Sequence, residues 1–284
     1  MGKGAARSTA EPMGASRWLL RTHSLVVYLF FYAPIVVLAA YSFNKSPIVG
    51  KWTGLTLSWY GDFLDHDNIQ ESIWISVKVC VASTLISVVL GTLAALSIER
   101  FRWWGQKTFD AVLYLPIIIP DVTMAVMLLV FFGETAQWFN VIPGVNLTDG
   151  LEKLVLSHVA FNISFVSVVV RARLANLDSS MEEAAADLYA SRWGAFRRVT
   201  LPQIMPGVLG GALLAITLSL DDVVVSSFVS GVGATPVSVY VVGMLRKGVR
   251  PLVNAVSVVI LAASMALVVA SLVLERATSS QKGK

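Results

Sequence analysis

Six long apolar stretches limit what this chain can fold into more than any other feature. They cover residues 24–43, 73–98, 111–132, 154–170, 206–228 and 252–274. A helix of about 20 apolar residues crosses the hydrocarbon core of a bilayer, and in lipid only a helix or a closed barrel satisfies its own backbone hydrogen bonds. The sequence therefore predicts an all-α membrane protein, a polytopic bundle of six transmembrane helices.

The composition supports this class and argues against several others. The chain has 284 residues, of which 56% are hydrophobic and 14% are charged, against about 25% charged residues in a soluble domain. The net charge of +4 does not indicate nucleic-acid binding, because the basic residues flank the apolar stretches. The single cysteine, Cys80, allows no disulfide within the chain, and the three histidines lack metal-ligand spacing.

The distribution of Lys and Arg predicts the orientation. With the N-terminus in the cytoplasm, fifteen of the 22 basic residues fall on the inner side and six on the outer side, and Lys78 lies within a span. The positive-inside rule therefore favours a cytoplasmic N-terminus and C-terminus. We expect a cytoplasmic arm over 1–23, a transmembrane domain over 24–274 with a cytoplasmic loop at about 174–202, and a cytoplasmic tail over 275–284.

The apolar segment 236–245 is too short to be a seventh span. Ten helical residues extend about 15 Å, whereas the hydrocarbon core is about 30 Å thick. A crossing would also move the basic C-terminus to the outer side. We interpret the segment as a short re-entrant or interfacial helix, with a plain helix in an outer loop as the alternative.

The polar loop between the fourth and fifth apolar stretches contains a helix-start signal. Ser180 precedes Glu183 by three residues, which is the spacing of a capping box. Glu182 also lies in the first turn, where the helix dipole favours negative charge. The alanines that follow keep the helix slim enough to lie in a groove of a partner. The sequence predicts a helix from near Ser180, with Pro202 as its distal limit; an ordinary capped helix on the membrane surface is the alternative.

Acidic residues within two of the apolar stretches are candidates for a transport path, because ionisable groups in a membrane usually face a cavity or a partner. Pro120 and Asp121 lie near the midplane of the third stretch, where prolines kink a helix. Asp221 and Asp222 lie nearer the outer side of the fifth stretch. The alternatives are that Asp121 caps a helix restart after Pro120, and that Asp222 is hydrated at the interface.

The polar loop resembles the "EAA" loop of the permease subunits of binding-protein-dependent ABC importers. That pattern is Glu-Ala-Ala, three residues, Gly, nine residues, Ile, one residue and Leu-Pro. This chain has EAA at 183–185 and LP at 201–202, with Val199 at the isoleucine position and Tyr189 at the glycine position. In the family the glycine makes a turn between two short helices. Here either the turn shifts, to Gly194, or the chain stays helical through Tyr189.

Further motifs look like the spermidine/putrescine importer permeases, and most of all like the second of their two permease subunits. They include SLDD at 219–222, SFVSG at 227–231 and SHVAF at 157–161, and the likeness extends from about residue 32 to residue 262. Family members often have Glu where this chain has Leu252.

This resemblance implies the fold of a type I ABC importer permease and a non-enzymatic role. The expected partners are a second permease in a heterodimer, two copies of a cytoplasmic ATPase, a periplasmic substrate-binding protein and the lipid of the bacterial inner membrane, with no nucleic acid. ATP and Mg bind to the ATPase, and this chain, which lacks a GxxxxGK[ST] loop, binds no cofactor. The implied coupling residues are Ser180, Glu182, Glu183, Ala184, Ala185, Tyr189, Gly194, Val199, Leu201 and Pro202. The candidate path residues are Pro120, Asp121, Asp221 and Asp222.

Three other functions are compatible with parts of the sequence. The substrate of the importer could be another small solute. A stand-alone secondary transporter also uses broken helices and carboxylates within the membrane. An intramembrane aspartyl protease would need Asp121 and Asp222 to converge, and their estimated depths, which differ by a turn or more, predict that they do not.

Overall fold

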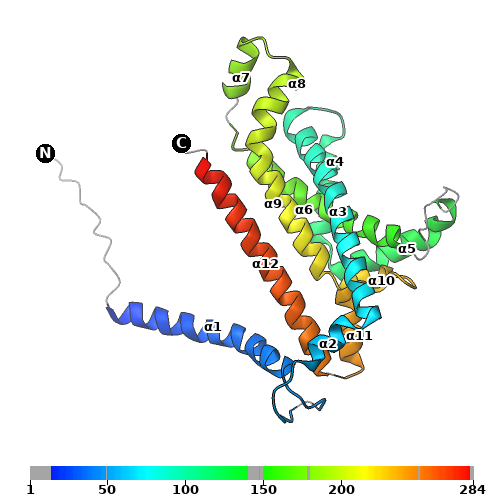
Figure 1. Cartoon of the computed structure of the whole chain (residues 1–284). Coiled ribbons are helices and arrows are strands. Elements are labelled where there is room, and N and C mark those ends of the chain that lie inside the picture. The colour runs from blue at the N-terminus through cyan, green and yellow to red at the C-terminus, as the bar shows by residue number, and fades with distance from the viewer. Residues whose placement is uncertain are drawn as a thin grey trace. The chain divides into compact units, whose positions relative to one another are not determined.

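The computed structural model describes residues 14–48, 50–139, 147, 150–177, 180–248 and 250–281, and this part of the chain is helical apart from connecting segments and one isolated β-bridge. The chain divides into two compact units, one formed by residues 1–65 and 247–284 and the other by residues 66–246. Figure 1 labels the helices in chain order. The predicted all-α class is confirmed.

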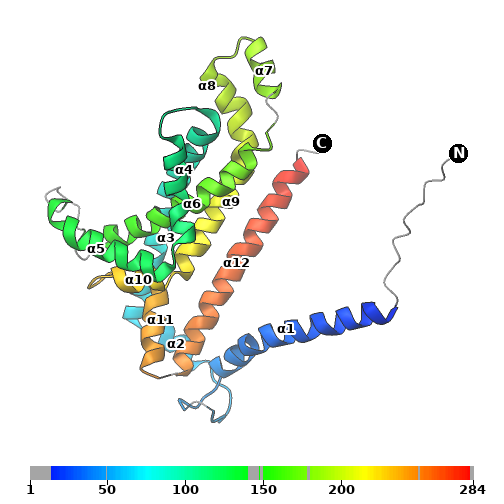
Figure 2. The same ribbon diagram turned by 180° about the vertical axis from the view of Figure 1, so that it is seen from behind.

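The larger unit is organised around three long helices that pack against one another: α3 (Asp67–Arg100), α6 (Leu151–Leu174) and α9 (Leu201–Asp221). Figures 1 and 2 both show them side by side. Val166 and Val170 of α6 and Ile204 of α9 are fully buried between them. Burial of these apolar side chains against neighbouring helices fixes the core that positions the site.

Small residues allow these three helices to approach closely. A Cβ atom added at Gly91 of α3 would lie 2.8 Å from Cβ of Val166, and one added at Gly207 of α9 would lie 2.8 Å from Cβ of Arg173. At Gly211 the nearest atom, again on Val166, would be 3.2 Å away. The GxxxG pair formed by Gly207 and Gly211 therefore packs against α6 of the same chain.

The third apolar stretch is not one kinked helix, and this part of the prediction is wrong. It forms α4 (Gln106–Ile118) and α5 (Asp121–Phe139), which are bent by 113° at the break between them. Pro120 has no N–H and disfavours the helical conformation of the residue before it. Ile119 accordingly has extended dihedral angles (φ −71°, ψ 132°). The helix restarts at Asp121, as the alternative interpretation of this residue expected.

The fifth apolar stretch also ends earlier than predicted. After α9, Asp222 leaves the helical conformation (φ −65°, ψ 120°), and the short helix α10 (Val224–Val229) follows. The segment 236–245 corresponds to the helix α11 (Val237–Arg246), which packs against α3. Its helical state is confirmed, and its place relative to the membrane stays a prediction.

The smaller unit contains α1 (Gly14–Ser42), α2 (Ser58–Leu64) and α12 (Pro251–Gln281), and α12 packs against the other two. Helix α1 begins ten residues before the predicted span and exposes apolar side chains along most of its length. The Tyr60 hydroxyl lies 2.8 Å from the Ser42 hydroxyl, and the Trp59 indole donates to the carbonyl of Asn44 (2.8 Å). These bonds fasten α2 to the end of α1.

Four helical segments in the described residues are long and apolar enough to cross a membrane: Trp18–Ser42, Asp67–Arg100, Leu151–Leu174 and Arg192–Asp221. The bent pair α4 and α5 is a fifth candidate, and the part of α12 whose side chains the structure describes contains the shorter apolar helix Pro251–Ala266. The count of six spans and the orientation therefore stay predictions. The first thirteen residues of the predicted arm and the last three of the predicted tail lie outside the described residues.

Candidate functional site

The two helix breaks meet at a cavity of about 260 Å³, which we call the carboxylate cavity. Its lining includes three carboxylates and two aromatic rings, those of Asp121, Asp221, Asp222, Phe161 and Phe165. The structure thus brings all three predicted acidic residues together, although their depths in straight helices had indicated otherwise. That estimate fails because both helices break where the carboxylates lie. Pro120 does not line the cavity but makes the break that delivers Asp121 to it.

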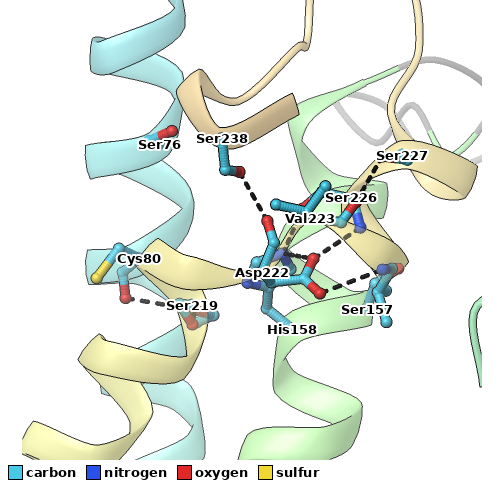
Figure 3. Close-up of polar contacts among 12 residues, drawn as sticks. Ser76, Cys80, Ser157, His158, Ser219, Asp222, Val223, Ser226, Ser227 and Ser238 are labelled. Carbon is cyan, nitrogen blue, oxygen red and sulfur yellow. Dashed lines mark hydrogen bonds and ion pairs between the residues drawn. The ribbon is translucent and has the colours of Figure 1, made fainter. Parts of the chain in front are cut away.

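The three carboxylates are not equivalent. Asp222 caps α10: its Oδ1 accepts from the Val225 amide (3.1 Å) and its Oδ2 from the Ser226 amide (2.7 Å). Its side chain is only 11% exposed, so the expectation of a residue hydrated at the interface is wrong. Figure 3 shows the Asp222 carboxylate turned toward α10 and His158. Both oxygens are therefore already engaged within the chain.

Asp121 and Asp221 are exposed, and neither side chain has a hydrogen bond or ion pair among the residues that the structure describes. Two unpaired carboxylates at one apolar-walled cavity attract cationic groups, since opposite charge offsets the cost of removing a cation from water. The rings of Phe161 and Phe165 add faces that also attract cations. Within the described residues no three His, Cys, Asp or Glu side chains are arranged to hold a metal ion.

A buried polar cluster lies next to the cavity, between α3, α6, α9 and α10 (Figure 3). Asn162 donates to the Ser219 hydroxyl (2.8 Å), and the Ser83 and Ser219 hydroxyls are 3.2 Å apart. Nε2 of His158 lies 3.1 Å from the Ser226 hydroxyl. The sequence patterns indicated no site role for these residues; His158 and Ser219 had a signal only as members of the SHVAF and SLDD motifs.

The loop between α6 and α9 begins with α7 (Ser180–Asp187), which starts where the sequence predicted. It ends at Asp187, well before Pro202. The Ala190 amide donates to the Ala185 carbonyl (3.0 Å) and the Tyr189 amide to the Ala186 carbonyl (2.9 Å), which is the pattern of a Schellman turn.

Tyr189 makes this turn in the left-handed region, with φ of 58°. Both alternatives for this position are therefore wrong, because the chain neither moves its turn to Gly194 nor stays helical. Gly194 lies instead in α8 (Arg192–Ala195), where its amide donates to the Ser191 hydroxyl (3.1 Å). Tyr189 is 98% exposed, so its ring meets no steric obstacle in this conformation.

Glu182 ties α7 to two other elements. Its carboxylate accepts two hydrogen bonds from the Arg100 guanidinium at the end of α3 (2.5 and 2.6 Å) and one from the Thr200 hydroxyl (2.5 Å). Partial burial raises the pKa of Glu182, but the hydrogen bonds from Thr200 and Arg100 and the charge of Arg100 outweigh this and lower it. Glu183, by contrast, is exposed on α7.

Thr200 ends the π-helical segment η1 (Phe196–Thr200), which also contains Val199 and runs into α9. Leu201 and Pro202 are the first two residues of α9, which continues the helical turns of η1. The remaining residues predicted for this loop, Ala184 and Ala185, lie on α7 next to Glu183.

A second ionic cluster adjoins the first through neighbouring residues of α3. Arg171 of α6 donates to Glu99 (2.9 Å) and to Asp110 of α4 (2.5 Å), and its guanidinium lies 5.9 Å from the centre of the Tyr114 ring. Since Glu99 precedes Arg100, the last turn of α3 connects α7, α6 and α4. Arg171 had been counted only as an orientation signal, and spacing along the chain could not reveal its partners.

Known proteins resemble this chain over most of its length. The pattern of the family described as "Binding-protein-dependent transport system inner membrane component" matches residues 87–279. The putrescine transport system permease protein PotI of Escherichia coli K12 is 40% identical over 240 residues, which cover 84% of each chain. The spermidine/putrescine transport system permease protein PotC of Haemophilus influenzae is 36% identical over 262 residues, covering 92% of this chain and 98% of the relative.

Solved structures show the same fold at lower identity. A chain from a bacterial ABC transporter involved in the import of the acidic polysaccharide alginate superimposes with a TM-score of 0.73 at 18% identity, over 92% of this chain and 96% of its own length. A chain from the MetNI methionine ABC transporter in an inward-facing conformation gives a TM-score of 0.59 at 18% identity, over 78% of this chain and 99% of its own length.

Proposed function

The chain belongs to the binding-protein-dependent transport system inner membrane component family, and we propose that it is the permease subunit of a bacterial ABC importer for polyamines such as putrescine and spermidine. Together with a second permease it forms the path through the inner membrane, as a multi-pass protein with both termini in the cytoplasm. Two copies of a cytoplasmic ATPase bind ATP and Mg, and a periplasmic binding protein delivers the substrate. The chain itself catalyses no reaction.

The observation that carries the substrate class is the pair of unpaired carboxylates at one cavity. Asp121 and Asp221 come from two different helix breaks, and each is left without a partner in the described part of the chain. A polyamine has at least two ammonium groups joined by a flexible apolar chain. Its charges match the two carboxylates, and its methylene groups match the rings of Phe161 and Phe165.

Ion pairs between the loop and the helices that lead to the cavity support a route by which conformational change in the ATPase could reach the cavity. We infer that the ATPase binds α7, which presents Glu183 and a row of alanines. Movement of α7 acts on α3 through the Glu182–Arg100 pair. Glu99, the neighbour of Arg100, pairs with Arg171 of α6, and Arg171 in turn pairs with Asp110 of α4. Helix α4 leads directly to the break before Asp121. The route consists of two groups of ion pairs joined by the consecutive residues Glu99 and Arg100.

The test is the ATPase activity of the complete complex in proteoliposomes, with binding protein, in the presence and absence of putrescine or spermidine. We expect hydrolysis to rise with polyamine in the wild type and to lose this response in Glu183→Ala, with the subunits still assembled. Asp187→Ala is the matched control, because Asp187 is an exposed carboxylate at the other end of α7.

Three outcomes would contradict different parts of the proposal. Stimulation that Glu183→Ala leaves unchanged would remove Glu183 from the coupling role. A response to another solute and to no polyamine would leave the permease function and reject the substrate class. Uptake by this chain alone, driven by an ion gradient, would favour a secondary transporter.

A further inference from the structure

We propose that His158 is a positioning residue that holds α10 in place and thereby sets the separation of the two free carboxylates at the cavity. The inference rests on the proposed function, because it concerns how the same cavity is shaped for its cation. His158 does not line the cavity. It acts through Asp222 and Ser226, the two residues with which it is in polar contact.

One ring nitrogen of His158 lies close both to the residue that caps α10, Asp222, and to a residue in its first turn, Ser226. Its Nε2 lies 3.1 Å from the Ser226 hydroxyl and 3.6 Å from Oδ2 of Asp222, and the side chain is 1% exposed (Figure 3). The nearby carboxylate favours the tautomer with hydrogen on Nε2, because the other tautomer would point a lone pair at an anion. The imidazole therefore supports the cap that begins α10.

The other nitrogen of the ring shows that His158 is more than a space-filling residue. Nδ1 is buried and has no hydrogen-bond partner among the described residues. Leaving a polar atom buried and unpaired costs free energy, and an apolar side chain of similar size would avoid that cost. The contacts of Nε2 with Ser226 and Asp222 therefore explain why an imidazole occupies this position.

The position of α10 matters because it lies between the elements that present the free carboxylates. Val225 and Val229 of α10 are buried in the same apolar cluster as Phe132 of α5. Helix α10 packs against α5, which begins at Asp121, and follows α9, which ends at Asp221. A shift of α10 therefore changes the distance between Asp121 and Asp221.

The experiment compares His158→Leu with His158→Gln in the complete reconstituted complex. Leucine removes the polar contact, whereas glutamine retains a side-chain N–H donor that can reach α10. We expect His158→Leu to lower putrescine uptake per ATP hydrolysed by up to about tenfold, the effect of losing one hydrogen bond, here the one with the Ser226 hydroxyl. Hydrolysis stimulated by the binding protein should persist, because the loop between α6 and α9 is untouched. His158→Gln should restore most of the uptake.

A double-mutant cycle tests whether His158 acts through Asp222. Added to Asp222→Ala, His158→Leu should cause little further loss, because its partner is already gone. When His158→Leu is combined with Asp121→Asn, the fold losses of uptake caused by the two single substitutions should multiply. Equal uptake by the Gln and Leu variants, or multiplication of the His158 and Asp222 losses, would overturn the proposal. If His158→Leu does not assemble, Ser226→Ala removes the hydroxyl partner instead and should lower uptake in the same direction.

Amide hydrogen exchange at Val225 and Ser226 separates this inference from the proposed function, because it requires no substrate. We expect faster exchange in His158→Leu and wild-type exchange in His158→Gln. If this pattern is found but the wild type takes up no polyamine, the positioning role stands and the proposed substrate fails. If exchange in His158→Leu is unchanged, the positioning role fails whatever the uptake.

Discussion

The carboxylate cavity and the loop between α6 and α9 use acidic residues in opposite ways. In and beside the loop, Glu182 pairs with Arg100, and Glu99 and Asp110 both pair with Arg171. At the cavity, Asp121 and Asp221 have no ionic partner within the described residues. The only cavity carboxylate with hydrogen bonds in that part of the chain, Asp222, uses them to start a helix.

The paired carboxylates in and beside the loop hold helices in a fixed arrangement, whereas the unpaired carboxylates at the cavity are available to bind a ligand. An Arg–carboxylate pair with two parallel hydrogen bonds holds two elements at a defined angle. An unpaired carboxylate at an apolar-walled cavity is costly to maintain, and such groups mark paths and binding sites in membrane proteins. Substitutions in the two regions are therefore expected to fail in different assays.

The largest effect is expected at the cavity. Asp121→Asn and Asp221→Asn should each lower putrescine uptake by about tenfold, and the double variant by about a hundredfold, because each removes one charged contact with the cation. Uptake of labelled putrescine into proteoliposomes measures this, with Asp187→Asn as the exposed control. Normal uptake by the double variant would show that the free carboxylates have no role in transport.

A smaller effect is expected from breaking the fixed pair in the loop. Glu182→Gln should speed amide exchange in α7 by up to about fivefold, because partly exposed ion pairs are worth up to about 1 kcal/mol. Glu183→Gln, one residue away and exposed, should leave exchange in α7 unchanged. The opposite pattern would assign the structural role to Glu183 and leave Glu182 as the residue available to the ATPase.

The same pair predicts a dependence on pH. Because the folded pKa of Glu182 is lowered, its contribution to stability is present above the ordinary glutamate pKa of about 4.3 and is lost as the pH falls through the folded value. Protection of α7 amides, corrected for intrinsic exchange, should therefore decline below about pH 4. In Glu182→Gln this decline should be absent, and a decline of equal size there would assign it to another carboxylate.

The smallest effect is expected at Tyr189. A left-handed conformation costs a residue with a Cβ atom roughly 1 kcal/mol relative to glycine, so Tyr189→Gly should stabilise the local turn by up to about that amount. Amide exchange at Ala190, whose N–H closes the turn, should slow correspondingly. Exchange at Val225 and Ser226 in the cavity region should not change. Faster exchange at Ala190 would show that the tyrosine ring stabilises the turn by other means.

Local patterns in the sequence predicted some of these features and missed others for identifiable reasons. The start of α7 at Ser180 and the acidic residues at the cavity followed from spacing and from charge within apolar stretches. The break at Pro120 was underestimated, because a proline signals a kink or a break and only packing decides the angle. The early end of α9 was missed, because the capping bonds of Asp222 depend on residues that follow it.

Contacts between residues that are distant along the chain could not be predicted from the sequence. Glu182 and Arg100 are 82 positions apart, and His158 and Ser226 are 68 positions apart. No periodicity or motif spacing connects such pairs, so the ionic clusters and the polar contact of His158 became visible only in the fold. Tyr189 is a local case: both sequence-based alternatives for this position were wrong, because the tyrosine tolerates the left-handed conformation that the family gives to glycine.

The close approach of α3 and α9 to α6 at Gly91, Gly207 and Gly211 has a mechanical consequence. Backbones separated by so little space cannot slide or rotate past one another without steric collision. We therefore expect these three helices to move as one rigid block. The path would then open to one side of the membrane and afterwards to the other through movement of the short helices at the two breaks, α4, α5 and α10, relative to this rigid block.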